Sequence, residues 1–197
     1  MHVSQDELEL LLRGLSNIHG MVLHPHECRP WIVHPFSLTP TLNCIEGRGC
    51  MWWAPCVWCA LGVATLAGGT VHIHTRLGAE SKPLKITVQD GSPIDVDGLF
   101  VHFAIPPAQA WDNVHEHCSM VLPFRSSAEI QHWCSRHRLP FGEPVPISQV
   151  AQLAKYWYGS HADPDWHKWT IDEAQEIFRR AGLTSSFWTI RNRSGRF

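Results

Sequence analysis

Hydrophobic residues recur with a helical period at the start of the chain and again over most of its second half. Residues 4–15 carry leucines on one face, and Ser4 with Glu7 has the spacing of a capping box. A Ser or Thr followed three residues later by Glu also precedes two of the later helical stretches. Together with a small-residue run that stops at a Gly-Gly pair, the pattern predicts helices at residues 4–15, 58–67, 108–117, 126–137, 147–158 and 170–182.

Alternation of apolar and polar residues dominates the middle of the chain and predicts strands. Two Asp-Gly dipeptides beside the alternating stretches mark turns. Ahead of these stretches, four prolines limit the chain to short edge strands. The predicted strands are residues 21–24, 31–35, 70–76, 84–88 and 99–104. We therefore expect an α+β fold, with a small central, mostly antiparallel sheet flanked by helices.

Composition narrows the class of protein. The chain has 197 residues, of which 44% are hydrophobic and 17% charged; it is long enough to bury a core and too apolar for a disordered chain. The net charge of -2 favours neither nucleic acid nor an anionic membrane as a partner. No apolar run approaches the roughly 20 residues that span a bilayer, and no signal segment opens the sequence. We expect a cytoplasmic protein.

Two cysteines three positions apart, Cys56 and Cys59, precede the helix predicted at 58–67. A thiol in the first helical turn lies near the positive end of the helix dipole, which favours the thiolate that attacks electrophiles and binds soft metals. An odd total of seven cysteines indicates free thiols, ligands or catalytic groups in a reducing compartment rather than a disulfide scaffold. Cys59, supported by Cys56, is the strongest candidate for chemistry.

Four interpretations compete for this cysteine pair. A structural zinc site needs two close pairs of ligands, and the sequence has one. A thioredoxin-like redox pair would follow directly on a βαβ unit, but the preceding segment is broken by prolines. A zinc deaminase needs His-x-Glu, which His24-Pro25-His26-Glu27 does not supply. The fourth interpretation is a thiol site for a soft metal or for nucleophilic chemistry, completed by a distant cysteine.

The run Trp58-Cys59-Ala60-Leu61, followed by a helix of small apolar residues, resembles the active-site segment of the organomercurial (alkylmercury) lyases. The resemblance continues in the same order through Gly69-Thr70, the hairpin at 79–88, the strand at 100–106, Cys118, Pro123-Phe124-Arg125-Ser126 and Trp133-Cys134-Ser135-Arg136-His137. It implies a lyase-like core at residues 38–160. A short N-terminal helix and extended segment, 1–37, would precede this core, and a helical extension, 161–197, would pack on it.

In that family two cysteines and an aspartate break a carbon–mercury bond by protonolysis, without a required cofactor, and Hg(II) then passes to another thiol carrier. The resemblance places the two cysteines at Cys59 and Cys118. Gly62 stands where the aspartate is expected, and glycine carries no proton; Trp58 and Gly62 are the expected pocket residues. Groups that could replace the acid are Cys56, His115, Glu116 and His117.

Three functions follow from these residues. The first is an alkylmercury-lyase-like enzyme that captures an organomercurial or another soft electrophile through Cys59 and Cys118. The second is a non-catalytic binder of Hg(II) or Cu(I), and the third a cysteine-dependent enzyme acting on a metal-free substrate. A thiol carrier protein or a low-molecular-weight thiol is the expected partner. We interpret the remaining cysteines as ordinary small buried residues: Cys28, Cys44, Cys50 and Cys134. His72 and His74 share a strand face, as His-x-His metal ligands often do, and we interpret them as a polar strand face.

Overall fold

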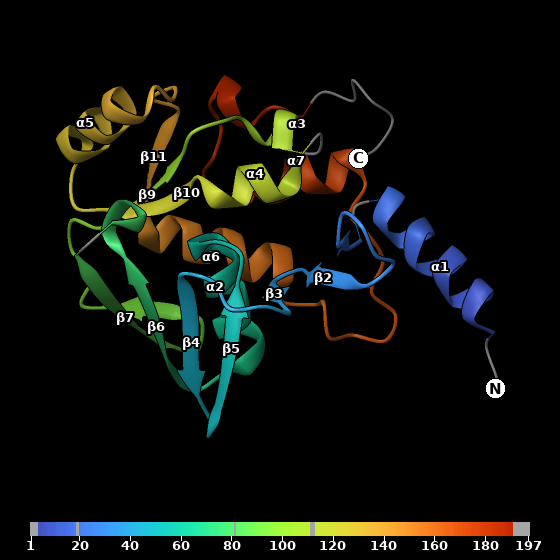
Figure 1. Ribbon diagram of the computed structural model, residues 1–197. Coiled ribbons are helices and arrows are strands. Elements are labelled where there is room, and N and C mark those ends of the chain that lie inside the picture. Colours follow the sequence, from blue (N-terminus) through green and yellow to red (C-terminus); the bar gives the residue numbers. More distant parts are fainter. Residues whose placement is uncertain (1–3, 19, 81, 111–112, 191–197) are drawn as a thin grey trace.

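The computed structural model describes residues 4–18, 20–80, 82–110 and 113–190, and shows two antiparallel sheets with helices packed around them (Figure 1). The larger sheet has the strand order β1-β2-β3-β5-β4-β6-β7-β8. Its strands are β1 Val22–Leu23, β2 Pro30–Val33, β3 Phe36–Ser37, β4 Asn43–Gly47, β5 Cys50–Ala54, β6 Thr70–Arg76, β7 Pro83–Gln89 and β8 Ser92–Ile94. The α+β class expected from the sequence is confirmed.

The second sheet has the order β10-β9-β11. It consists of β9 Phe100–Phe103, β10 Val121–Phe124 and β11 Glu143–Pro146. The sequence pattern indicated only the first of these strands, because β10 is buried throughout and does not alternate, and β11 contains two prolines.

The helices agree with the expected ones except in one place. They are α1 Gln5–Asn17, α2 Val57–Ala67, α3 Pro107–Ala110, α4 Val114–Ser119, α5 Ser127–His137, α6 Ile147–Tyr158 and α7 Ile171–Arg180, with short 3₁₀ turns at Leu77–Ala79 and Ser186–Trp188. The single helix expected at 108–117 is wrong. Asn113 has an extended φ of -151° and its side chain accepts from the Glu116 N–H, so that a new helix begins there.

Helix α2 forms the centre of the molecule and positions the candidate site. It packs against strands β4, β5 and β6 on one side and against α6 on the other (Figure 1). Residues 57–64 are all buried, as the uniformly apolar sequence of this helix requires. The helix ends at Gly68, whose φ of 64° suits a residue without a side chain.

The C-terminal part of the chain shares this core. Phe178 of α7 and Trp188 are completely buried in the same hydrophobic cluster as α2. Burying a large aromatic side chain contributes about 1.5–3 kcal/mol to folding. Helix α1, by contrast, lies at the edge of the molecule and buries no residue fully (Figure 1). None of the helices in the described ranges has the length and apolar character needed to cross a membrane.

A candidate thiol site

The site begins at the residue that caps the N-terminus of α2. Cys56 is the N-cap of this helix, and its sulfur accepts a hydrogen bond from the Cys59 N–H at 3.3 Å. Ser, Thr, Asp or Asn usually fills this position, because a side-chain acceptor there satisfies a free helical N–H. A cysteine in the same place puts a sulfur where both the N–H groups and the helix dipole favour negative charge.

Helix α4 brings a second segment to the same point. Cys118 is buried on this helix, and the ligand atoms of His34, Cys59 and Cys118 all lie within 4.8 Å of one another. The structure thus brings together the two cysteines that the resemblance paired, although they are far apart in the sequence. His34, between β2 and β3, was missed because no ligand spacing links it to either cysteine.

Two further groups contact the sulfur of Cys59. The Nδ1 atom of His34 lies 3.6 Å from it, and the hydroxyl of Tyr158 lies 3.4 Å from it. Tyr158 is the last residue of α6 and is buried, so its hydroxyl reaches the sulfur from inside the protein. Burial and the nearby sulfurs raise the pKa of Tyr158 well above its usual value, so the phenol keeps its proton.

The three thiols share their ionisation. Burial opposes the ionisation of Cys56, but hydrogen bonds from Cys118 and Cys59 outweigh it and hold the pKa of Cys56 well below its usual range. Burial and the neighbouring Cys56 raise the pKa of Cys59 well above its usual value. Hydrogen bonds to the other two cysteines, together with burial, raise the pKa of Cys118 in the same way. These shifts favour the thiolate at Cys56 over the other two sulfurs, and the three thiols titrate as one coupled group.

Cys59 and Cys118 line a cavity of about 400 Å³. Its walls are mainly aromatic and aliphatic, and the lining residues in the described parts of the chain include no carboxylate. Trp58 and His117 also line it; the indole Nε1 and both ring nitrogens of His117 are buried without a hydrogen-bond partner among the described residues. Burial lowers the pKa of His117 to about 4, so its ring is neutral at neutral pH.

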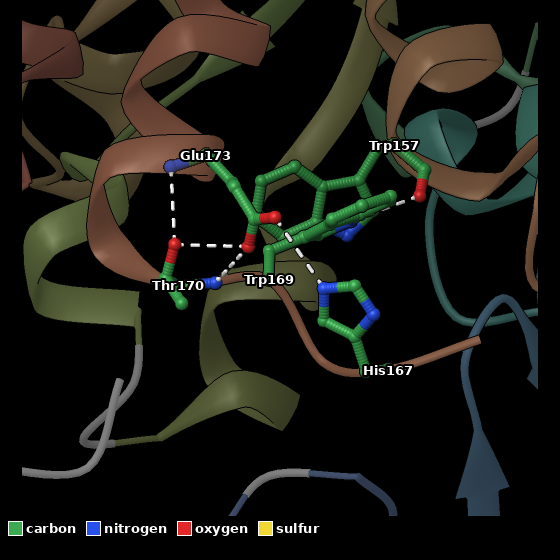
Figure 2. Close-up of polar contacts among 5 residues, drawn as sticks. All are labelled: Trp157, His167, Trp169, Thr170 and Glu173. Atoms are coloured by element: carbon green, nitrogen blue, oxygen red, sulfur yellow. Dashed lines mark hydrogen bonds and ion pairs between the residues drawn. The ribbon is translucent and has the colours of Figure 1, made fainter. Parts of the chain in front are cut away.

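One wall of the cavity comes from the segment that follows α6. His161, Trp166 and Trp169 line the cavity, and the rings of the first two lie 4.3 Å apart. Figure 2 shows how the end of this segment is held: Trp169 Nε1–H donates to the Trp157 carbonyl at 3.1 Å, and Thr170 and Glu173 form the capping box of α7. Both neighbouring helices thus fix this wall.

The other expected groups lie elsewhere. His115 and Glu116 are exposed on α4, where the His115 ring stacks on Trp31 at 4.8 Å, so neither reaches the thiols. Of the three α4 candidates for the missing acid, only His117 faces the cavity. Gly62 is not among the lining residues; it lies under the ring of Tyr158.

The remaining cysteines are only partly as expected. Cys44 and Cys134 are buried, but the expectation of burial is wrong for Cys50, which is exposed at the start of β5, and Cys28 is only half-buried. The outward position of Cys50 follows from its place beside the hairpin turn between β4 and β5. His72 and His74 form a polar strand face and contact Thr87 and Glu46.

Fold and site together define an α+β protein with a buried thiol cluster that opens on an apolar cavity. The family model for alkylmercury lyase, MerB, matches residues 36–159, so the chain belongs to this family of lyases acting on carbon–mercury bonds. A crystal structure described as the mercury-bound form of MerB2 has a similar fold, with a TM-score of 0.59 and 19% identity over 80% of this chain and 74% of that one. The curated proteins contain no match. The family expected from the sequence is confirmed.

Proposed function

We propose that the protein captures organomercurials through Cys59 and Cys118 and cleaves their carbon–mercury bond. The observation that carries this proposal is the meeting of these two sulfurs, within 4.8 Å, at an apolar cavity. A metal–sulfur bond of about 2.3 Å for zinc, and somewhat longer for heavier ions, lets one mercury atom bind both sulfurs at this separation. Family membership supports the same reaction.

The unequal ionisation of the cluster suits the first step. The lowered pKa of Cys56 favours its thiolate form, which accepts hydrogen bonds from its neighbours and can take the proton of Cys59 as that sulfur attacks mercury. The leaving group on mercury departs with its electron pair. This gives Cys56 the role of a local base, and it needs no cofactor.

In the second step the other cysteine displaces the carbon. The sulfur of Cys118 forms a second bond to mercury as the mercury–carbon bond breaks, and the electron pair of that bond takes up a proton to give the hydrocarbon. Over both steps one thiol proton passes to Cys56 and the other to the carbon, the leaving group departs as an anion, and Hg(II) remains on two sulfurs. A low-molecular-weight thiol or a thiol carrier protein would then remove it by ligand exchange.

The cavity supports an apolar organic group on the substrate. An apolar lining of this kind would leave little water around the reacting atoms, which would strengthen the electrostatic effect of a thiolate. We take residues 38–160 as the catalytic core. The segment after it, within 161–197, would contribute one wall of the cavity and so affect which organic groups fit.

A second candidate function is the storage or delivery of a thiophilic metal, such as Hg(II) or Cu(I), without bond cleavage. The observation that favours it is His34, which adds a nitrogen ligand to Cys59 and Cys118. Two thiolates and an imidazole are a donor set that soft and borderline metals bind well. This candidate makes no use of the cavity.

One assay separates these functions. The full-length protein would be mixed with phenylmercury and excess thiol, and benzene would be measured by gas chromatography. We expect benzene from the wild type and a loss of at least about 1,000-fold in Cys59→Ser and in Cys118→Ser. Cys134→Ser is the matched control and should retain full activity.

Stoichiometric Hg(II) uptake without any benzene would contradict the lyase and support the metal binder. Labelling by a metal-free electrophile that requires Cys59 but tolerates the loss of Cys118, again without benzene, would instead support a cysteine-dependent enzyme with another substrate.

A further inference from the structure

A lyase of this kind must deliver a proton to the carbon, and the cavity offers no carboxylic acid. Among the described lining residues, the groups that carry N–H or O–H are histidines, tryptophans, one lysine and Tyr158. The acid position expected from the sequence is a glycine.

The hydroxyl of Tyr158 lies 3.4 Å from the sulfur of Cys59. This places an O–H group beside the atom that would hold mercury, and therefore close to the carbon bound to that mercury. A phenol is protonated at neutral pH and both donates and accepts hydrogen bonds. His117, in contrast, has no hydrogen bond to any sulfur among the described residues, and its pKa leaves it neutral.

Gly62 makes this position of Tyr158 possible. A Cβ atom at residue 62 would lie 2.8 Å from Cγ and 2.9 Å from Cε2 of the tyrosine ring. Contacts under 3.0 Å essentially never occur for real Cβ atoms, and the ring is fixed by the packing of α6 on α2. Any other residue at 62 would displace the ring, so the glycine and the tyrosine form one structural unit.

We infer that Tyr158 is the catalytic proton relay of this protein, in the space that Gly62 leaves free. This inference rests on the proposed lyase function. As the mercury–carbon bond breaks, its electron pair takes the phenolic proton and forms a C–H bond. The phenol oxygen takes the thiol proton of Cys118, whose sulfur forms the second bond to mercury. The tyrosine ends as it began, and no oxidant or reductant is needed.

The test compares two tyrosines of the same helix. Tyr156 lies two residues before Tyr158 on α6. Its ring faces Arg180, whose guanidinium carbon lies 4.3 Å from the ring centroid. Both substitutions remove a phenolic hydroxyl: Tyr158→Phe removes it inside the site, and Tyr156→Phe removes it outside the site. The measurements are single-turnover benzene release from phenylmercury and the stoichiometry of Hg(II) binding.

We expect Tyr158→Phe to slow benzene release about 100-fold while it binds Hg(II) as the wild type does, and Tyr156→Phe to leave both quantities unchanged. Gly62→Ala, which displaces the ring, should also slow release with Hg(II) binding retained.

Wild-type release in Tyr158→Phe would overturn the inference alone. A Tyr158→Phe variant that loses Hg(II) binding as well would also overturn it, because the residue would then be structural. A wild-type protein that releases no benzene would overturn the proposed function and the inference with it.

Discussion

Within the residues that the structure describes, two buried neighbourhoods combine cysteine with histidine, and they differ in the ionisation of their thiols and in access to a cavity. In one, Cys134 of α5 lies 3.7 Å from Nε2 of His102 on β9. In the other, three cysteines meet at the start of α2 with His34 and His117 beside them. The cysteines of both neighbourhoods are buried, and in each a histidine nitrogen lies within 3.7 Å of a sulfur.

The first neighbourhood holds a single thiol. Nε2–H of His102 donates to the carbonyl of Phe141 at 2.7 Å, and burial raises the pKa of the single thiol, so Cys134 stays a neutral, inert group. In the second neighbourhood hydrogen bonds from two further thiols and from the helix N-terminus lower the pKa of Cys56, and a cavity gives access to the sulfurs of Cys59 and Cys118. Burial of a cysteine beside a histidine is thus insufficient for a site; a stabilised charge and space for a ligand are also required.

The substitution Cys56→Ser should have the largest effect on the difference in thiol reactivity between the two neighbourhoods. Serine keeps the N-cap of α2, so the fold should persist. Without the Cys56 thiolate no base remains beside Cys59, and burial keeps the pKa of the Cys59 and Cys118 thiols raised, so alkylation of the cluster by iodoacetamide should slow by roughly tenfold or more.

The measurement is the rate of modification of Cys59 and Cys118 by mass spectrometry, with Cys134→Ser as the control that should leave this rate unchanged. An unaltered rate in Cys56→Ser would show that Cys56 does not hold the charge.

The next largest effect is expected in the pH dependence of stability, from the two buried histidines His117 and His102. The pKa of His117 is about 4 in the folded protein and about 6.5 when the chain is unfolded, so protonation favours unfolding. Its contribution to stability is complete above pH 6.5 and is lost as the pH falls towards 4. Between pH 8 and pH 5 the free energy of unfolding of the wild type should fall by about 2 kcal/mol more than that of His117→Gln, as measured by urea unfolding.

His102→Gln provides the comparison from the other neighbourhood. Burial also lowers the pKa of His102, but its hydrogen bond to Phe141 acts in the opposite direction. The difference between this variant and the wild type over the same pH range should therefore be smaller than for His117→Gln. If both variants differed from the wild type by the same amount, the thiol cluster, including Cys56, would offset the effect of burial on the pKa of His117.

The sequence predicted most of what depends on local interactions. The capping boxes of α1 and α7 and the whole of α6 agree with the expected helices, because each depends on residues a few positions apart. The hairpin of β4 and β5 was missed. Its turn residues Arg48 and Gly49 have φ values of 51° and 72°, but Arg-Gly lacks the usual Asn-Gly or Asp-Gly signal.

Within the site, Cys59 and Cys118 could be named in advance because their segments resemble a family. His34 and Tyr158 could not, since packing of α6 on α2 and the path between β2 and β3 bring them to the sulfur. Gly62 was a usable signal: a glycine within a fully apolar helix indicates close approach of another group.

The smallest effect should come from Cys134→Ala, and it completes the comparison of the two neighbourhoods. Removing one buried sulfur leaves a small cavity beside His102 and should lower the free energy of unfolding by about 1 kcal/mol. Hg(II) binding and benzene release should stay within about twofold of the wild type, because no group of this neighbourhood lines the thiol cavity. Loss of activity in the folded variant would mean that the two neighbourhoods are coupled through β9, and that the inert one supports the reactive one.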